Sequence, residues 1–219
     1  MINENVKEVN KSSVISIEEV NFSTHRFIKP IKKIEDGDDV HFFKRSKAFS
    51  DVASFILLLN ISMFPRRSNT QGDSELRSCV LGVEDVYSSS VMVMNLRALL
   101  KRLRDHISEV PPDTGPRRFG NVSFRKWYAA IQDKSLELLK EHLPNIVKGP
   151  EQEGEGITAA DELNSYFMGS FGSPERLDYG TGHELNFIAF LAGIWKLGGF
   201  QNTSQGDEER AIVIGVFEP

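Results

Sequence analysis

The feature that most constrains the fold is an apolar run near the C-terminus. From Leu185 to Leu197 almost every residue is apolar, so we expect a helix that is buried nearly all round rather than along one stripe. Gly198 and Gly199 follow it, and glycine supplies the left-handed cap at which many helices end. Such a helix needs other elements around it. The sequence therefore predicts a buried central helix over about 181–197 within a multi-helix domain.

A polar, glycine-rich segment leads directly into this run. Its seven residues are Asp178, Tyr179, Gly180, Thr181, Gly182, His183 and Glu184. The two glycines allow backbone conformations that residues with a Cβ avoid. Thr181 and Glu184 have the three-residue spacing of a capping box, in which each side chain accepts a hydrogen bond from a backbone N–H group at the helix start. Because helix N-termini also attract anions, the segment predicts either a well-capped loop or a binding site, and the local sequence leaves both open.

Four further stretches carry apolar residues at helical spacing. They run from about 46 to 60, from about 94 to 107, from the loop at 117–121 to about 143, and from 158 to 169. Residues 36–39 are typical of a turn or loop, and 75–90 show little periodicity. The apolar run 211–217 is compatible with strand or helix. These patterns together predict an all-α domain.

Composition excludes several classes of protein. A net charge of −5 over 219 residues argues against nucleic acid as the main partner. The single Cys79 excludes an internal disulfide and fits a reducing compartment. No apolar run is long enough to span a membrane, so we expect a soluble intracellular protein. Residues 1–24 predict a loose N-terminal tail, and 149–156 predict a flexible acidic linker within a helical domain over 25–219.

The residues reveal no familiar catalytic or metal site. None of the five histidines stands in an H-E-x-x-H pattern or a Cys–His cluster, so no metal site is predicted. The sequence has no G-x-S-x-G motif, and Cys79 lacks the electropositive surroundings of a nucleophile. His183 and Glu184 are adjacent and point in different directions, which favours a structural hydrogen-bonding role for His183 over general-base chemistry. The catalytic residue stays unknown.

A second block, Arg118-Phe119-Gly120-Asn121, opens the helix that continues through Phe124, Arg125, Trp127 and Tyr128, whose aromatic rings we expect to face inward. Arg118 and Arg125 lie near the helix start, where cations are unfavourable. Their partner is therefore expected to be an anion. Arginine binds carboxylate and phosphate equally well, so an internal carboxylate and a bound phosphate both remain open.

These two blocks resemble the two signatures of the phosphotyrosyl phosphatase activator family, also called the type 2A protein phosphatase activators. Weaker similarity occurs at 27–30, 46–51, 55–60 and 111–112. The blocks stand in the family's order, and the resemblance extends from about Phe27 to Phe217.

The resemblance implies an all-helical fold with a groove between subdomains. Members bind the catalytic subunit of type 2A serine/threonine phosphatases, help convert it to its active form, are assigned peptidyl-prolyl cis–trans isomerase activity, and bind ATP with Mg²⁺. By motif position, the segment 178–184 would line the groove that faces the phosphatase and a proline-containing peptide. Arg118, Gly120, Asn121 and Ser123 would belong to the nucleotide side. The cytoplasm and the nucleus are the expected locations.

Family members continue beyond Glu218-Pro219, so the last third of the family fold is expected to be missing from this sequence. Three interpretations follow. The chain is an isomerase-type phosphatase activator, a non-catalytic phosphatase-binding module, or an inactive shortened member of the family.

Overall fold

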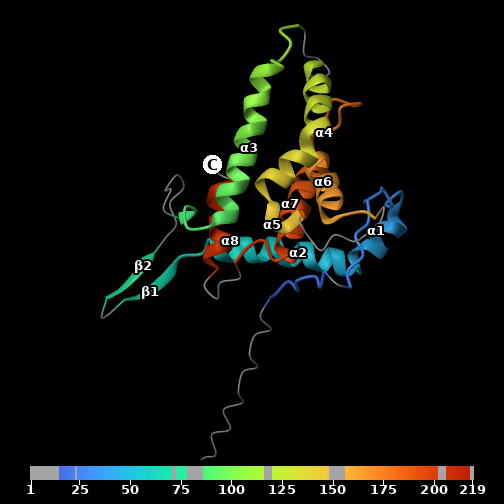
Figure 1. Ribbon diagram of the computed structural model, residues 1–219. Coiled ribbons are helices and arrows are strands. Elements are labelled where there is room, and N and C mark those ends of the chain that lie inside the picture. Colours follow the sequence, from blue (N-terminus) through green and yellow to red (C-terminus); the bar gives the residue numbers. More distant parts are fainter. Residues whose placement is uncertain are drawn as a thin grey trace, which may run out of the picture.

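The computed structural model describes residues 15–22, 24–70, 73–77, 86–115, 120–147, 156–201 and 206–217. Its helices are α1 (Gly37–Lys44), α2 (Lys47–Ser62), α3 (Val91–Glu109), α4 (Ser123–His142), α5 (Pro144–Val147), α6 (Ala159–Gly169), α7 (Thr181–Lys196) and α8 (Asp207–Ile212), followed by a π-helical turn at Val213–Phe217 (Figure 1). The all-α prediction is confirmed, and the ambiguous run 211–217 is helical. Strands β1 (Arg66–Thr70) and β2 (Asp73–Arg77) add one antiparallel hairpin that the sequence did not predict.

Helix α7 lies between α2 and α6 and carries much of the core. Phe190, Leu191 and Ile194 are buried, but Leu185 in the second turn is 42% exposed. The prediction that this helix is buried nearly all round is therefore wrong for its first two turns. At its other end the predicted glycine cap is confirmed: Gly198 has φ +70°, and the Gly199 N–H donates to the Ile194 carbonyl at 2.9 Å.

The predicted capping box at the start of α7 is wrong. Gly180 occupies the N-cap position, no side chain caps the helix, and Thr181 is already its first residue. The Gly180 carbonyl accepts the first-turn N–H groups of His183 and Glu184, at 2.8 and 3.4 Å, so the helix starts one residue earlier than expected. A true capping box occurs instead at α6, between Thr158 and Asp161.

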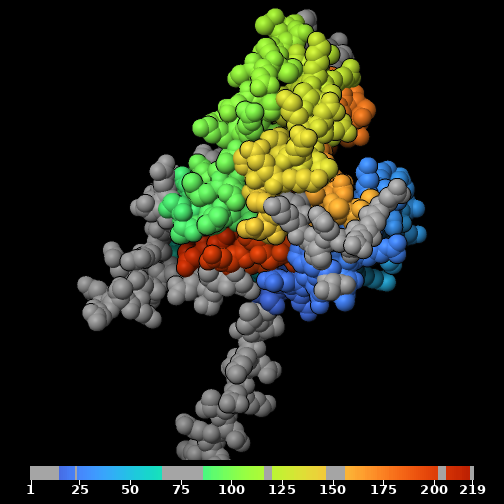
Figure 2. Space-filling view, in the orientation of Figure 1, coloured from blue at the N-terminus to red at the C-terminus, as the bar shows by residue number. Residues whose placement is uncertain are grey.

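Helices α3 and α4 pack against each other and rise away from the rest of the molecule (Figure 1). The space-filling view shows this pair, in green and yellow, above the red and blue segments (Figure 2). The pair turns back through 110–122, where the second sequence block lies. Helix α4 also packs on α6, which connects the pair to the rest of the domain.

Several local expectations are met or corrected near the N-terminus. Helix α2 begins close to the predicted start at residue 46, and Ser46 is its N-cap, accepting the Phe49 N–H at 3.1 Å. Residues 36–39 are not a loop, because the Asp36 carboxylate accepts two N–H groups and starts α1. The chain already contacts the domain at Ile17, which is buried, earlier than the predicted tail boundary at residue 24. The predicted linker 149–156 lies outside the described residues except for Gly156.

None of the helices that the structure describes has the length and apolar character needed to cross a lipid bilayer.

Candidate functional site

The two sequence blocks, far apart along the chain, meet in space. Gly120 has φ +87°, and a Cβ placed there would lie 2.7 Å from the carbonyl oxygen of Leu177 and 2.9 Å from its Cβ. Leu177 itself has φ +57°, which is unusual for a residue with a branched side chain. The block that contains Gly120 therefore packs against the residue that immediately precedes Asp178.

The loop that leads into the segment 178–184 is closed by backbone pairing and by one arginine. Ser173 and Asp178 form an antiparallel bridge, with the Ser173 N–H donating to the Asp178 carbonyl at 3.1 Å. From α4, Arg125 donates to the carbonyls of Pro174 and Glu175 at 2.8 and 3.0 Å. The partner of Arg125 is thus a pair of backbone oxygens rather than the carboxylate or phosphate that the sequence suggested. This contact joins α4 to the loop.

His183 is held by three neighbours. Its Nδ1 lies 2.7 Å from the Gly169 carbonyl, and since a carbonyl only accepts, Nδ1 carries the proton. Its ring stacks on Tyr179 with centroids 5.5 Å apart. Its Nε2 faces Asp178, with Oδ1 at 4.0 Å. The predicted structural hydrogen bond of His183 is confirmed, and the histidine anchors the first turn of α7 to the end of α6.

Asp178 and Tyr179 have shifted acidities. Arg176 donates to Asp178 Oδ2 at 2.7 Å, and this hydrogen bond holds the pKa of the Asp178 carboxyl below its usual value. Partial burial, together with the charge of Glu184, raises the pKa of the Tyr179 phenol. At neutral pH the segment therefore presents a carboxylate beside a neutral phenol that can donate a hydrogen bond.

The corner Gly180–Thr181–Gly182 is open. All three residues are exposed, and a Cβ added at Gly180 or Gly182 would meet nothing within 4 Å. Gly180 is extended, with φ −160°, so the expectation that the turn demands glycine is wrong at this position. In the described part of the chain, the N–H groups of Thr181 and Gly182 have no recorded hydrogen bond. The start of α7 thus presents two backbone N–H groups without an acceptor, beside two glycines that leave the backbone accessible.

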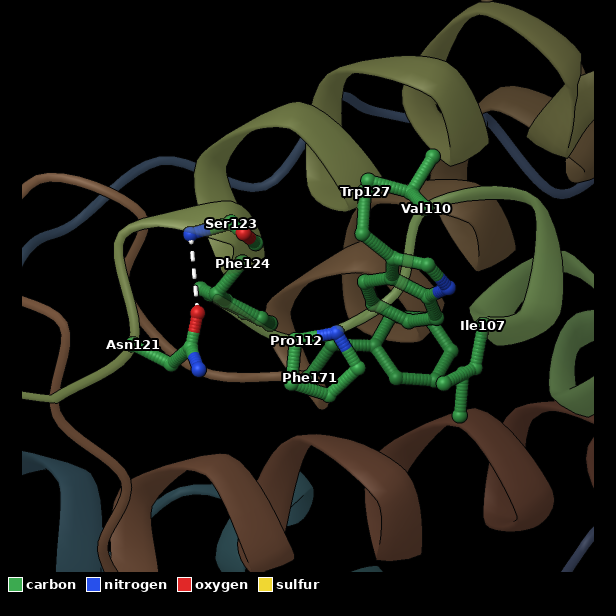
Figure 3. Close-up of a pocket in the computed structure, with 8 residues that line it drawn as sticks. All are labelled: Ile107, Val110, Pro112, Asn121, Ser123, Phe124, Trp127 and Phe171. Atoms are coloured by element: carbon green, nitrogen blue, oxygen red, sulfur yellow. Dashed lines mark hydrogen bonds between the residues drawn. The ribbon is translucent and has the colours of Figure 1, made fainter. Parts of the chain in front are cut away.

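A pocket of about 310 Å³ lies next to this corner, between the end of α3 and the start of α4 (Figure 3). It is lined by Ile107, Val110, Pro112, Asn121, Ser123, Phe124, Trp127 and Phe171. A Cβ added at Gly172 would stand 3.6 Å from both Phe124 and Tyr179. Gly172 therefore lies beside both Phe124, which lines the pocket, and Tyr179, which immediately precedes the corner.

The residues assigned to a nucleotide are largely occupied by the fold. The Asn121 side chain accepts from the N–H groups of Asp113 and Ser123 at 3.1 and 3.0 Å, and donates to the Asp113 carbonyl at 3.0 Å. Gly120 is required by its contact with Leu177. Of the four, Asn121 and Ser123 line the pocket, and Arg118 lies outside the described residues.

The described residues among these four, Gly120, Asn121 and Ser123, offer neither a cation for the phosphates nor a carboxylate for Mg²⁺. In the described ranges no group of three or more acidic, histidine or cysteine side chains could hold a metal ion, and both polar atoms of the Asn121 side chain already take part in hydrogen bonds of the loop. ATP with Mg²⁺ stays a prediction from resemblance, and no step of the proposed function depends on it.

Comparison with known proteins establishes the family. Residues 30–219 match the model of the family described as "Phosphotyrosyl phosphate activator (PTPA) protein". The chain belongs to this family. Among the curated members, it is 48% identical over 196 residues to serine/threonine-protein phosphatase 2A activator 1 of Aspergillus fumigatus and 50% identical over 196 residues to that of Emericella nidulans.

A solved member of the PTPA family supports the fold. The crystal structure described as that of the PP2A phosphatase activator Ypa1 PTPA1 superposes with a TM-score of 0.65 at 25% identity. The match covers 91% of this chain and 61% of that one. The chain spans less than half of the two curated relatives, 41% and 44% of their lengths.

Two features of the site escaped sequence reasoning. Trp127 was expected in the core with the other aromatic residues of its helix, yet it lines the pocket. Leu177 gave no signal, because a left-handed leucine has no sequence signature. The spacing Phe124–Trp127 could have suggested a ring surface, since both residues fall on one face of a helix.

Proposed function

We propose that this chain binds the catalytic subunit of a type 2A serine/threonine phosphatase through the segment 178–184 and supports its activation. The curated relatives carry the name of phosphatase 2A activators, which supports the partner. The observation that carries the proposal is the open corner: Gly180 and Gly182 are exposed, and their lack of a side chain serves no contact within the described fold. Glycine costs helix stability, so its use here is explained by a partner that approaches the backbone.

The chemistry of the corner suits a polypeptide ligand. The N–H groups of Thr181 and Gly182 stand at the positive end of α7 and can donate to carbonyl or carboxylate oxygens. Tyr179 offers a ring that is 60% exposed, and aromatic residues are common anchors at interfaces. Asp178 and Glu184 add negative charge for a basic group of the partner.

The scaffold beneath the corner is well fixed, which favours binding over mere loop closure. His183 is tied to Gly169, Arg125 to the preceding loop, and the Asn186 amide donates to the Gly182 carbonyl at 3.1 Å. A site held in one geometry loses less conformational entropy when its ligand arrives.

Prolyl isomerase activity is the finer part of the proposal. Rotation about an X–Pro bond has a barrier of about 18–20 kcal/mol and requires no nucleophile. A groove accelerates it by binding the twisted amide more tightly than either planar form. N–H donors held at a helix start can stabilise that twisted state, because its nitrogen becomes a hydrogen-bond acceptor.

Co-purification with a type 2A catalytic subunit tests the proposal, with and without Mg²⁺-ATP. Gly182→Ala and Asp178→Gly should each abolish retention of the phosphatase. The matched control is Gly37→Ala, which also places a methyl group in the first turn of a helix where nothing lies within 4 Å. If Gly182→Ala binds as tightly as the control, the corner is not the binding surface.

The isomerase activity is tested separately, by the rate of cis–trans exchange of a prolyl peptide derived from the phosphatase. Acceleration that Asp178→Gly removes would support an isomerase-type activator. If the chain retains the phosphatase but does not accelerate cis–trans exchange of the peptide, the result would support a non-catalytic binding module.

A further inference from the structure

The N-terminal part of the described chain exposes several large apolar side chains to solvent. Helix α1 has no buried residue, and its Phe42 is 79% exposed, more than any other large apolar side chain in the described ranges. The stretch before α1 exposes three isoleucines, Ile28, Ile31 and Ile34. Single exposed apolar residues are common on proteins, but several close together mark an interaction surface. We call residues 26–45 the N-terminal surface.

This surface is held in place by contacts with the rest of the domain. The Ile28 N–H donates to the Glu162 carboxylate of α6 at 2.9 Å. The rings of Phe43 and Phe49 pack edge-on, with centroids 5.6 Å apart, which joins α1 to α2. Figure 1 shows α1 at one edge of the molecule, at the opposite end of α2 from the hairpin β1–β2. The exposed side chains are therefore a fixed feature of the fold.

The acidic side chains of the N-terminal surface are mostly engaged within it. Glu35 pairs with Lys32. The Asp36 carboxylate caps α1, and the Asp39 carboxylate accepts the Glu35 N–H at 2.9 Å. Of the four acidic residues in 26–45, these contacts leave one, Asp38, whose side chain makes no contact within the surface.

The basic side chains of the same surface are mostly unpaired. Apart from Lys32, all of them are exposed and have no side-chain hydrogen bond or ion pair in the described part of the chain: Arg26, Lys29, Lys33, Lys44 and Arg45. The surface thus has a local excess of positive charge, although the whole chain has a net charge of −5. Apolar and basic groups therefore occur together over about twenty residues.

This combination fits an anionic lipid surface. Peripheral membrane-binding segments bury their apolar side chains at the level of the headgroups, while lysine and arginine are attracted to the anionic lipids. Residues 28, 31 and 34 recur at a spacing of three, which places them on one edge of an extended chain with three residues per turn, the conformation that proline favours. A protein partner would need acidic groups placed opposite each of these cations, whereas a bilayer adapts to apolar groups that project singly.

We propose that the N-terminal surface binds the face of an anionic membrane, with Ile31 and Phe42 inserted between the headgroups and the unpaired basic side chains on the lipid phosphates. The protein then lies on the bilayer, which requires no spanning helix. Neither kind of contact is sufficient alone, since stable attachment at a membrane surface takes two signals. The inference goes beyond the proposed function and does not depend on it, because it concerns a different surface from the segment 178–184.

Sedimentation of the full chain with phospholipid vesicles tests the charged part of this inference. We expect retention on phosphatidylcholine vesicles that contain about 30% phosphatidylserine, little retention on phosphatidylcholine alone, and release as salt is raised to about 1 M. The double variant Lys29→Gln with Lys33→Gln should bind about thirtyfold more weakly, which corresponds to about 1 kcal/mol for each charge. Its matched control is Lys134→Gln with Lys140→Gln, which neutralises two exposed lysines of α4.

A second pair of variants tests the apolar part. Phe42→Ser should weaken vesicle binding about tenfold, because the variant has no ring to bury. The control is Phe64→Ser, which removes a ring that is 57% exposed beyond the opposite end of α2. Both variants should unfold at the same urea concentration as the parent, since neither ring belongs to the core.

Several outcomes would overturn the inference. The parent chain could fail to sediment with the anionic vesicles, or bind phosphatidylcholine alone equally well. Equal losses in a test variant and its control would show that the N-terminal surface is not the contact. Binding of a soluble peptide of alternating glutamate and leucine, without binding to vesicles, would assign the surface to a protein partner instead.

Discussion

Glycines serve opposite purposes on the two sides of this site. At the joint between the two sequence blocks, Gly120 and Gly172 have φ of +87° and +111°, and a Cβ on either would lie within 2.9 Å of a backbone oxygen. At the corner, Gly180 and Gly182 have ordinary conformations and open space around them. The joint needs glycine for folding, whereas the corner does not.

This difference separates stability from recognition. A substitution in the joint acts on the protein alone, because the added atoms clash with its own backbone. A substitution at the corner acts on whatever approaches from outside. Substitutions in the joint should therefore destabilise the fold, whereas substitutions at the corner should leave the protein folded but unable to bind the phosphatase.

The largest effect is expected for Gly120→Ala. The left-handed φ costs about 1–3 kcal/mol for a residue with a side chain, and the overpacking against Leu177 adds a similar amount. Urea titration should show a clear loss in the free energy of unfolding, while Gly37→Ala stays close to the parent. A Gly120→Ala protein as stable as the parent would show that the two blocks do not meet as described.

A smaller loss is expected for Arg125→Met, which removes the two hydrogen bonds to the loop at 174–175. Because the arginine is exposed, we expect about 1 kcal/mol rather than the full value of two charge-assisted bonds. Phosphatase retention should weaken as well, since the loop positions Asp178. Arg125→Lys is the informative control, because lysine keeps the positive charge but lacks the planar guanidinium that donates to both carbonyls. Parent-like behaviour of Arg125→Lys would mean that charge alone matters.

Gly182→Ala is expected to change stability in the opposite direction. Alanine is the better helix former and meets no neighbour at this position, so the free energy of unfolding should rise by about 0.5 kcal/mol. The same variant should lose the phosphatase. A destabilised Gly182→Ala protein would blur the distinction between joint and corner, because its binding defect could then come from the fold.

The sequence predicted the helices well because their signals are local. The apolar stripe of each helix and the glycine cap at Gly198 each depend on neighbours within one or two turns. The burial of α7 was overestimated, since burial depends on which helices pack against each turn. Leu185 is as apolar as Leu191, yet Leu185 is exposed and Leu191 is fully buried.

The site was only partly predictable for the same reason. The segment 178–184 was found from its own pattern. The contact of Gly120 with Leu177 and the reach of Arg125 to the loop join residues about 40 or more positions apart. Such contacts leave no periodic trace in a single sequence.

The smallest expected effect is on stability in acid, and it arises at Asp178, two residues before the corner. The hydrogen bond from Arg176 lowers the pKa of Asp178 in the folded protein. The Asp178 carboxylate therefore stabilises the fold at pH values above its unfolded pKa of 3.8. This stabilisation is lost as the pH falls through the lower pKa of the folded state. The parent should therefore be slightly more stable than Asp178→Asn at about pH 7, and this gap should shrink as the pH falls toward about 2. Because both side chains are exposed, added salt should also reduce the gap. Urea titrations of the two proteins at both pH values measure it, and a gap that widens in acid would show that Arg176 and Asp178 do not pair in solution.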